Sequence, residues 1–295
     1  MRANGSRMGD LHPLSAAIYF LCVLVVTMFS GNPVITLSGL LGAIALFPFV
    51  CDGKTVLKTF GGLGVSILVI TAINPFISHN GVTKLFTFLR INVSLESLLY
   101  GANFAAIFSA VIIWGACMGS VMKSEKITYL LGRIAPKTAM VLSMSLRFIP
   151  LFSEKARKIS RSRNVLGLAE GEGKNRLSYA AKTFSALVGW SLENSVETAN
   201  SMKARGYGRS ARGTFFKYAF GFSDVAVLSA ALLLTALNAV GQAMGGGFEF
   251  YPKITAIPHG TTDIIAYGAF FILAILPAVI EIVWRIKWKF YESKI

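Results

Sequence analysis

The segment 168–174 comes nearest to a known chemical motif in this sequence. It reads LAEGEGK. A phosphate-binding loop has a glycine five residues before its Gly-Lys pair and a serine or threonine after it, but these positions hold Leu168 and Asn175. Glu170 and Glu172 would also repel a phosphate group. We therefore predict that this chain binds no nucleotide and carries no cofactor.

Side chains that could ligate a metal are few and scattered. None of the three histidines has a second histidine or a cysteine at i+3 or i+4, and the three cysteines form no CxxC pair. These residues are His12, His79, His259, Cys22, Cys51 and Cys117. The sequence also contains no GxSxG, HExxH or clustered carboxylates, which common nucleophilic and metal-dependent mechanisms need. We predict neither a metal site nor an enzyme.

One arginine at a predicted helix end is a candidate for recognition. Ala204 and Arg205 stand directly before Gly206. Such an end has an ordinary explanation, because glycine supplies a left-handed cap and arginine complements the helix dipole. Alternatively, a rigid helix end presents the planar guanidinium of Arg205 to a partner, and its small neighbours permit close approach. Both explanations fit these residues taken alone.

The composition indicates a membrane protein. Of the 295 residues, 54% are hydrophobic and 15% are charged, and 29 Lys and Arg face 14 Asp and Glu, for a net charge of +15. A basic nucleic-acid-binding domain would have more charge and fewer long apolar runs, so no nucleic-acid partner is expected. The hydrophobicity also excludes a disordered chain.

Six stretches without Asp, Glu, Lys or Arg are long enough, or nearly so, to cross a bilayer. They are Leu14–Ser30, Val34–Val50, Phe60–Ile77, Ser97–Ser120, Val225–Phe248 and Ile264–Ile280. The first stretch follows basic residues as in a signal peptide, but no clear cleavage site comes after Phe29. We therefore expect a retained helix.

Basic residues set the expected orientation. Residues 121–224 hold 18 Lys and Arg against 7 Asp and Glu. Because basic loops stay on the cytoplasmic side, this segment and both termini are predicted to be cytoplasmic in a multi-pass protein of the cell membrane. The expected organisation is a bundle of four spans over 1–120, a cytosolic region over 121–224 and two further spans over 225–295.

Apolar residues in the cytosolic region recur at helical spacing over two ranges, Met140–Ile159 and about Ser178–Ala204. Their stripes include Leu142, Leu146, Ile149, Phe184, Val188 and Leu192. Such helices could lie on the bilayer, pack together as a subdomain, or dock on a partner protein. The predicted fold class is all-α: a polytopic membrane protein with about six transmembrane helices and two long amphipathic cytosolic helices.

Four short motifs occur in a specific order along the chain. They are Asn74-Pro75 with His79, Gly81 and Thr83; Arg147-Phe148-Ile149-Pro150 with Glu154 and Ala156; Ala204-Arg205-Gly206; and Gly208 with Arg212, Gly213 and Thr214. In order and spacing they resemble the transmembrane (T) component of energy-coupling factor (ECF) importers, the EcfT/CbiQ/BioN-like family. The resemblance covers most of the chain.

This resemblance implies a non-catalytic subunit of an importer for a vitamin or a transition-metal ion. In that family, two coupling helices end in Ala-Arg-Gly motifs whose arginines bind grooves on two ABC-type ATPase subunits. The helices also cradle a membrane-embedded substrate-binding protein, the S component, which ATP-driven movement would reorient. On the same resemblance, we expect contacts with the S component at Leu142, Leu146, Ile149, Pro150, Phe184, Val188 and Leu192.

One motif departs from the family pattern. Counting from the Arg-Phe-Ile-Pro motif places the first Ala-Arg-Gly at Val165-Leu166-Gly167, so the glycine is kept and the arginine is not. Arg163 or Arg161 could reach the same groove from an earlier position on the helix. Arg205 is therefore the expected principal anchor for an ATPase.

The alternative function is a channel or carrier that works alone and is regulated by its cytosolic helices. Ion-coupled carriers usually place ionisable groups inside the membrane bundle. The six apolar stretches contain no acidic or basic residue, which disfavours this alternative.

Overall fold

The computed structural model describes residues 7–51, 53–77, 84–88, 91–167, 176–207, 218–245 and 260–292, with single positions at 248, 250, 255 and 258. Parts of the predicted motifs lie outside these residues: 78–83, 168–175 and 208–214. His79 and His259 also lie outside them.

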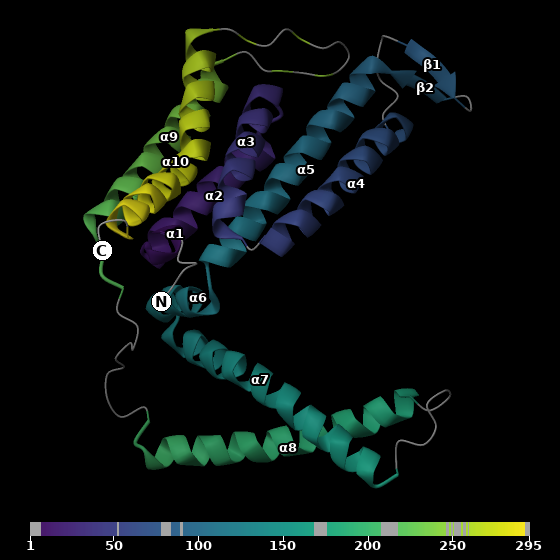
Figure 1. The fold of residues 1–295 in the computed structure, drawn as a ribbon, viewed down its shortest axis with the longest axis vertical. Coiled ribbons are helices and arrows are strands. Elements are labelled where there is room, and N and C mark those ends of the chain that lie inside the picture. The colour runs from purple at the N-terminus through teal and green to yellow at the C-terminus, as the bar shows by residue number, and fades with distance from the viewer. Residues whose placement is uncertain are drawn as a thin grey trace. The chain divides into compact units, whose positions relative to one another are not determined.

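Helices make up almost all of the described chain (Figure 1). They are α1 (Arg7–Asp10), α2 (Pro13–Phe29), α3 (Pro33–Val50), α4 (Gly53–Ile77), α5 (Leu95–Val121), α6 (Ser124–Ile134), α7 (Pro136–Val165), α8 (Arg176–Ala204), α9 (Phe222–Met244) and α10 (Thr261–Glu292). The all-α polytopic fold class is confirmed. An antiparallel strand pair between α4 and α5, β1 (Lys84–Phe88) with β2 (Ile91–Ser94), was not predicted.

The chain forms two compact units. The membrane unit combines Met1–Lys123 with Tyr218–Ile295, and the helix-pair unit is Ser124–Lys217. The N-terminal and C-terminal membrane segments, which are far apart in the sequence, therefore pack together as one body.

Each predicted apolar stretch lies within or almost within one helix of the membrane unit. Five of these helices, α3, α4, α5, α9 and α10, are long and apolar enough to cross a bilayer, and the apolar α2 is shorter, at 17 residues. Helix α10 continues beyond Ile280 and includes Glu281 and Arg285. The predicted apolar stretch, Ile264–Ile280, therefore lies within a longer helix.

Local sequence explains the starts of α2 and α3. The Nδ1 atom of His12 accepts a hydrogen bond from the Leu14 amide at 3.2 Å, and the Asn32 side chain accepts one from the Val34 amide at 3.0 Å. Proline follows each of these caps at the first helical position, where its missing N–H costs nothing. Both chain segments therefore begin as capped helices.

Aromatic side chains fill the centre of the membrane unit. Tyr19, Phe20 and Trp114 are fully buried and meet edge to face. The Trp114 indole donates to the Gly39 carbonyl at 3.0 Å, and the Tyr19 hydroxyl donates to the Leu273 carbonyl at 2.6 Å. These bonds satisfy the polar atoms of the buried rings and join α2, α3, α5 and α10.

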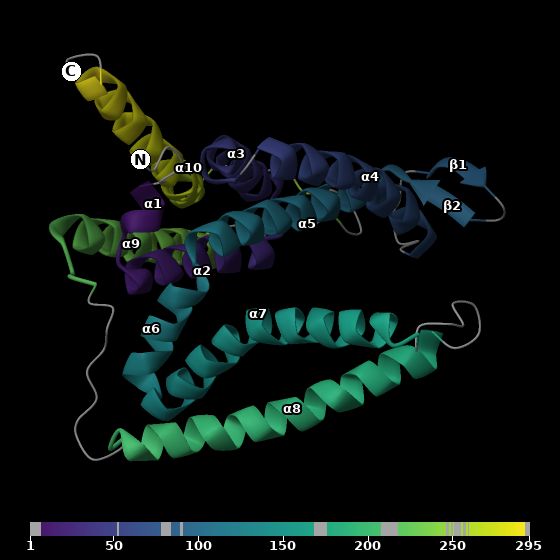
Figure 2. The same cartoon turned by 60° about the horizontal axis from the view of Figure 1, so that its bottom comes forward.

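Small residues bring α10 close to two neighbours, α3 and α9, against which it packs (Figures 1 and 2). A Cβ atom added to Gly42 of α3 would lie 2.6 Å from the Cβ of Ala274. One added to Gly241 of α9 would lie 2.5 Å from the Cβ of Ala266. Only glycine fits at these contacts, as is usual for closely packed membrane helices.

A buried carboxylate joins the starts of α2 and α9. Asp224 is 6% exposed, and its two oxygens accept hydrogen bonds from the backbone amides of His12 at 2.7 Å and Gly221 at 2.9 Å. The ring of Phe220 lies 4.4 Å from that of His12, measured between centroids. Asp224 therefore both caps α9 and ties the chain that enters it to the N-terminal segment.

Glu281 makes a second polar link in the same unit. Its side chain is fully buried, accepts a hydrogen bond from the Arg7 amide at 2.8 Å and lies 3.5 Å from the Nε atom of Arg285. Arg285 in turn donates to the Phe49 carbonyl at 2.7 Å. This group holds α1, α10 and the C-terminal end of α3 together.

Replacing Asp224 by alanine should destabilise the membrane unit by about 1–3 kcal/mol, because the buried His12 amide and the partly buried Gly221 amide lose their acceptor. The measurement is thermal unfolding of the purified protein in detergent. Asp10→Ala, which removes an exposed carboxylate, is the matched control and should leave the transition unchanged. Equal transitions for the two variants would contradict the role given to Asp224.

Candidate functional site on the helix pair

The helix-pair unit is built from α6 and two much longer helices. Helix α7 has 30 residues and α8 has 29, so each is roughly 45 Å long at 1.5 Å per residue. In Figure 1 the two helices cross, and Figure 2 shows them running side by side. Residues early in α7 meet residues late in α8, and the end of α7 meets the start of α8, so the two helices are antiparallel.

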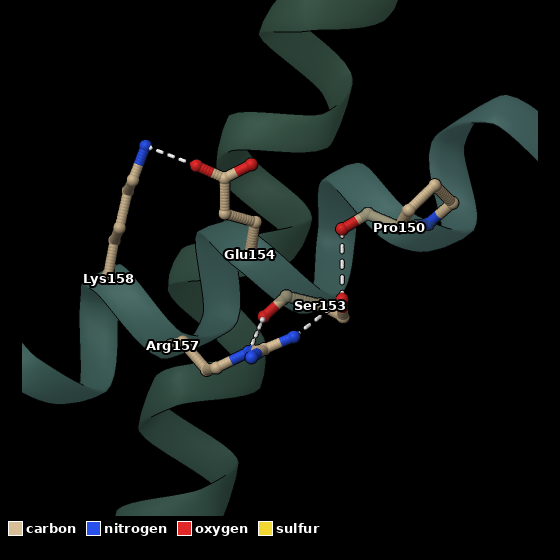
Figure 3. A network of polar contacts seen from close by, with 5 residues as sticks. All are labelled: Pro150, Ser153, Glu154, Arg157 and Lys158. Carbon is tan, nitrogen blue, oxygen red and sulfur yellow. Dashed lines mark hydrogen bonds and ion pairs between the residues drawn. The ribbon is translucent and has the colours of Figure 1, made fainter.

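Helix α7 runs unbroken through Pro150. On its surface the Ser153 hydroxyl donates to the Pro150 carbonyl at 2.9 Å, and Arg157 donates to the Ser153 carbonyl at 3.3 Å (Figure 3). Lys158 and Glu154 form an exposed ion pair at 2.7 Å, which lowers the pKa of the Glu154 carboxyl. That pair is intact at neutral pH and is lost as the pH falls through the lowered pKa.

Aromatic and cationic side chains join the middles of α7 and α8. The rings of Phe152 and Trp190 meet edge to face with centroids 5.8 Å apart. The Lys155 ammonium lies 5.1 Å from the centre of the Trp190 ring, and Phe148 stacks on Phe152. These contacts are discrete and replace a continuous core: α8 has no buried residue among those described, and α7 has only Ala139.

Arg163 fixes the end of α7 to the start of α8. One of its terminal nitrogens, Nη1, donates to the Tyr179 carbonyl and to the Thr183 hydroxyl, both at 2.9 Å. Its guanidinium also lies 4.4 Å from the centre of the Tyr179 ring. The Tyr179 hydroxyl donates back to α7 at the Asn164 side chain, at 2.8 Å. This predicted ATPase contact is thus engaged inside the helix pair, whereas Arg161 is exposed.

The α8 end, defined as Ala204-Arg205-Gly206, is a rigid cap. Gly206 has a positive φ of 70°, its amide donates to the Lys203 carbonyl, and the next amide, of Tyr207, donates to the Met202 carbonyl. These two bonds form a Schellman motif, which closes the helix around a left-handed glycine. The side chain of Arg205 is therefore exposed on a fixed backbone.

A polar groove of about 510 Å³ lies beside the α8 end. It is lined by residues of both helices, including Arg147, Glu197 and Arg205. A second groove of about 460 Å³, lined mainly by apolar side chains such as Met140, Met144 and Met202, adjoins it. Arg205 thus stands at the edge of a mixed polar and apolar surface, which suits a protein partner.

The α7 end, defined as Val165-Leu166-Gly167, has the same kind of cap. Gly167 has a φ of 71°, and its amide donates to the Asn164 carbonyl. Leu166 therefore occupies in α7 the position that Arg205 occupies in α8. Val165 is 87% exposed and Leu166 is 71% exposed.

One face of α8 carries exposed apolar side chains at four-residue spacing. The α8 ridge consists of Phe184, Val188, Leu192 and Val196, which are 40–66% exposed. Polar and aromatic residues such as Tyr179 and Trp190 contact α7 instead. The apolar row of α8 therefore does not form the contact between the two helices.

The remaining residues predicted to contact an S component lie on α7. Leu142 and Leu146 are half-buried, whereas Ile149 and Pro150 are exposed. Ile149 and Pro150 are therefore accessible at the surface, and Leu142 and Leu146 are accessible only in part.

Asn74 has a role that the sequence analysis missed. It lies in the last turn of α4, directly before Pro75. The Asn74 side chain donates to the Ser97 carbonyl at 2.7 Å, and Gly101 leaves room for it. This residue therefore fastens α4 to α5.

Among the described residues, no group of three His, Cys, Asp or Glu side chains could hold a metal ion.

Comparison with known proteins identifies the family. Residues 8–214, which include both long helices and the α8 end, match the family model CbiQ, described as cobalt transport protein. The chain belongs to this family. The family expected from the motifs is therefore confirmed, and the protein is a transmembrane component of transport machinery.

Two curated relatives carry energy-coupling factor names. The chain is 26% identical over 183 residues to the energy-coupling factor transporter transmembrane protein EcfT 1 of Listeria monocytogenes, an alignment that covers 58% of this chain and 69% of the relative. It is 32% identical over 111 residues to EcfT of Bacillus selenitireducens, over 37% of this chain and 41% of the relative. These similarities agree with a component of the ECF type.

Replacing Arg163 by alanine should loosen the end of α7, because two hydrogen bonds and a ring contact are lost together. Amide hydrogen exchange at Tyr179–Thr183 should accelerate about tenfold, as expected from losing roughly 1.4 kcal/mol of local stability. Arg161→Ala removes an exposed arginine of the same helix and should not change the exchange rate. Unchanged exchange in Arg163→Ala would show that the contact does not hold the pair.

Proposed function

We propose that this chain is the energy-coupling subunit of an ECF-type importer. The helix pair would connect two ABC-type ATPase subunits at its ends to a membrane-embedded S component on its apolar face. ATP hydrolysis takes place in the partner subunits, and this chain transmits their movement without catalysing a reaction. The S component would select the cargo, a vitamin or a transition-metal ion.

The α8 ridge is the observation that carries this proposal. A row of large apolar side chains on a helix with no buried residue is costly to expose to water, and such patches mark interaction sites. Four residues spaced by one turn form a continuous row roughly 18 Å long. A membrane-embedded S component offers the apolar surface that would cover such a row.

The α8 end supports contact with an ATPase subunit. Arg205 is exposed on a backbone fixed by its glycine cap, so little conformational freedom is lost when the guanidinium is bound. The planar guanidinium pairs bidentately with carboxylates. An acidic groove on an ATPase surface would bind it well.

The alternative, a carrier that works alone, would use a buried ionisable group for coupling. Glu281 is such a group in α10, but its contacts with Arg285 and the Arg7 amide give it a structural role in joining α1, α3 and α10. The coupling function therefore remains the better proposal. In liposomes, the chain alone should transport nothing.

Arg205→Ala should weaken capture of the ATPase subunits more than Arg163→Ala. Truncating a charged anchor at an interface costs about 2–5 kcal/mol, whereas Arg163 is engaged within the helix pair. The measurement is the amount of ATPase that co-purifies with the full-length chain from cells expressing the complex. An equal loss for the two variants, or no loss for Arg205→Ala, would contradict this assignment.

Replacing Phe184 and Leu192 together by serine should release the S component and leave the ATPases bound. The two substitutions remove exposed apolar side chains, so they should not unfold the helix. Co-purification of both partner classes is measured for this variant and for Ser185→Ala, a control on the same helix. The proposal for the α8 ridge fails if S-component binding persists in the double variant.

A further inference from the structure

An apolar groove of about 680 Å³ lies in the membrane unit. Its walls come from the end of α2, from α5 and from aromatic residues between α9 and α10. The lining side chains are mostly apolar, and none of those described is charged. They include Phe29, Phe104, Ile107, Phe108, Val111 and Phe250. A groove of this size and chemistry suits a largely apolar ligand.

One side of the groove follows a single face of α5. The lining residues of this helix recur every three or four positions, at 100, 103, 104, 107, 108 and 111, which is the spacing of one helical face. Tyr100 lies in the second turn of α5 and Val111 lies just past its middle. They are 11 positions apart, so the groove is roughly 16 Å long. This length is close to one leaflet of a bilayer whose hydrocarbon core is about 30 Å thick.

The two ends of the groove differ in polarity. At one end lie Ser30 and Gly31, in the turn between α2 and α3, together with Asn103 of α5. The Asn103 side chain donates to the Gly31 carbonyl at 3.1 Å. Because irregular backbone is not tolerated against hydrocarbon, we expect this turn to lie at the membrane surface. Ile107 and Val111 make the other end apolar.

Ser30 brings an unsatisfied hydroxyl to the polar end. This residue is 2% exposed, and its Oγ atom has no hydrogen-bond partner among the described residues. Its backbone amide, in contrast, donates to the Val26 carbonyl at 3.0 Å. A buried hydroxyl without a partner is unfavourable. A ligand that offers an acceptor at this end of the groove would therefore gain a hydrogen bond that the described chain does not supply.

Aromatic rings shape the polar end. Tyr100 stacks on Phe104 with centroids 6.5 Å apart and meets Phe250 edge to face at 5.4 Å. Phe250 in turn meets Phe248 at 4.8 Å. All four rings line the groove. Tyrosine is enriched where a bilayer meets water, which agrees with the expected position of this end at the membrane surface.

We propose that the groove binds a phospholipid of the surrounding bilayer, with one acyl chain along α5 and an ester carbonyl at Ser30. The length of the groove fits one leaflet, and its polar end lies at the level where the ester groups of a bilayer lie. The Ser30 hydroxyl donates to the carbonyl. Because the described lining is uncharged, the charge of the head group does not select the lipid. The proposal does not depend on the coupling function.

A helix of a protein partner fits the groove less well. A helix with its side chains is about 10 Å across, so a 16 Å length occupies roughly 1,250 Å³ and enters the groove only in part. Its backbone acceptors are used within the helix, so an apolar helix leaves the Ser30 hydroxyl unpaired. An acyl chain is thinner, and it is joined to an ester group that supplies the acceptor.

The test labels the full-length chain in nanodiscs of phosphatidylcholine, part of which carries a photoreactive diazirine in one acyl chain. Labelled peptides are identified by mass spectrometry. Labelling of Phe104–Val111 should exceed labelling around Val65 and Leu68 about tenfold, because those exposed residues of α4 report lipids that only surround the protein. Equal labelling of the two regions would overturn the proposal.

Two further conditions test the nature of the ligand. A phosphatidylglycerol probe should give the same labelling ratio as phosphatidylcholine, and a strong preference for the anionic lipid would contradict binding through the ester group. Labelling should also persist in membranes of cells that express the chain with its natural partners. Loss of labelling there would assign the groove to a protein and overturn the proposal, with no consequence for the coupling function.

Ser30→Ala tests the hydrogen bond. It should lower the labelling of Phe104–Val111 about fivefold, the effect of one lost hydrogen bond. The thermal transition of the lipid-free chain in detergent should not fall, because the hydroxyl has no partner in the described chain. Ser38→Ala is the matched control and should label normally, since its buried hydroxyl donates to the Ile35 carbonyl at 2.8 Å within α3.

Ile107→Trp tests the groove itself. The larger side chain fills the apolar end and should reduce labelling to the level of α4. Ile112→Trp places the same ring on an exposed position of α5 outside the groove and should label normally. Undiminished labelling in both Ser30→Ala and Ile107→Trp would overturn the proposal.

Discussion

The helix pair depends on a few discrete contacts, because it has almost no core. Two helices of about 45 Å touch through an edge-to-face ring pair in the middle and through Arg163 at one end. Such contacts fix the relation of the two helices while leaving most of their apolar surface uncovered. The unit is therefore ordered enough to present specific surfaces, and its apolar side chains remain accessible on them.

The membrane unit is held together in the opposite way. Glycine and alanine bring α10 against α3 and α9, and buried rings fill the space between the helices. Polar links sit where chain segments begin or end: Asp224 at the start of α9, and Glu281 with Arg285 near the N-terminal segment. Asp224 is placed where the chain returns from the helix-pair unit to the membrane unit.

Much of the fold was predictable because membrane spans leave a strong one-dimensional signal. Uninterrupted apolar stretches coincide with α2, α3, α4, α5, α9 and α10, and the glycine after Arg205 marks a helix end correctly. The orientation of the α8 ridge was not predictable, since helical spacing gives a face without saying what covers it. The hydrogen bonds of Arg163 were not predictable either, because their acceptors, Tyr179 and Thr183, lie on another helix.

The sequence alone determined the helices, their apolar faces, the loss of the first motif arginine and the resemblance to the T component of ECF importers, since these are properties of local composition and spacing. Only the tertiary structure showed that Arg163 is bonded to α8, whereas Arg205 is exposed. It also showed that the apolar row of α8 is exposed. The structure further showed that Leu166 occupies in α7 the position that Arg205 occupies in α8. These outcomes depend on which side chains of separate helices come within hydrogen-bonding or packing distance, and no local pattern encodes that distance.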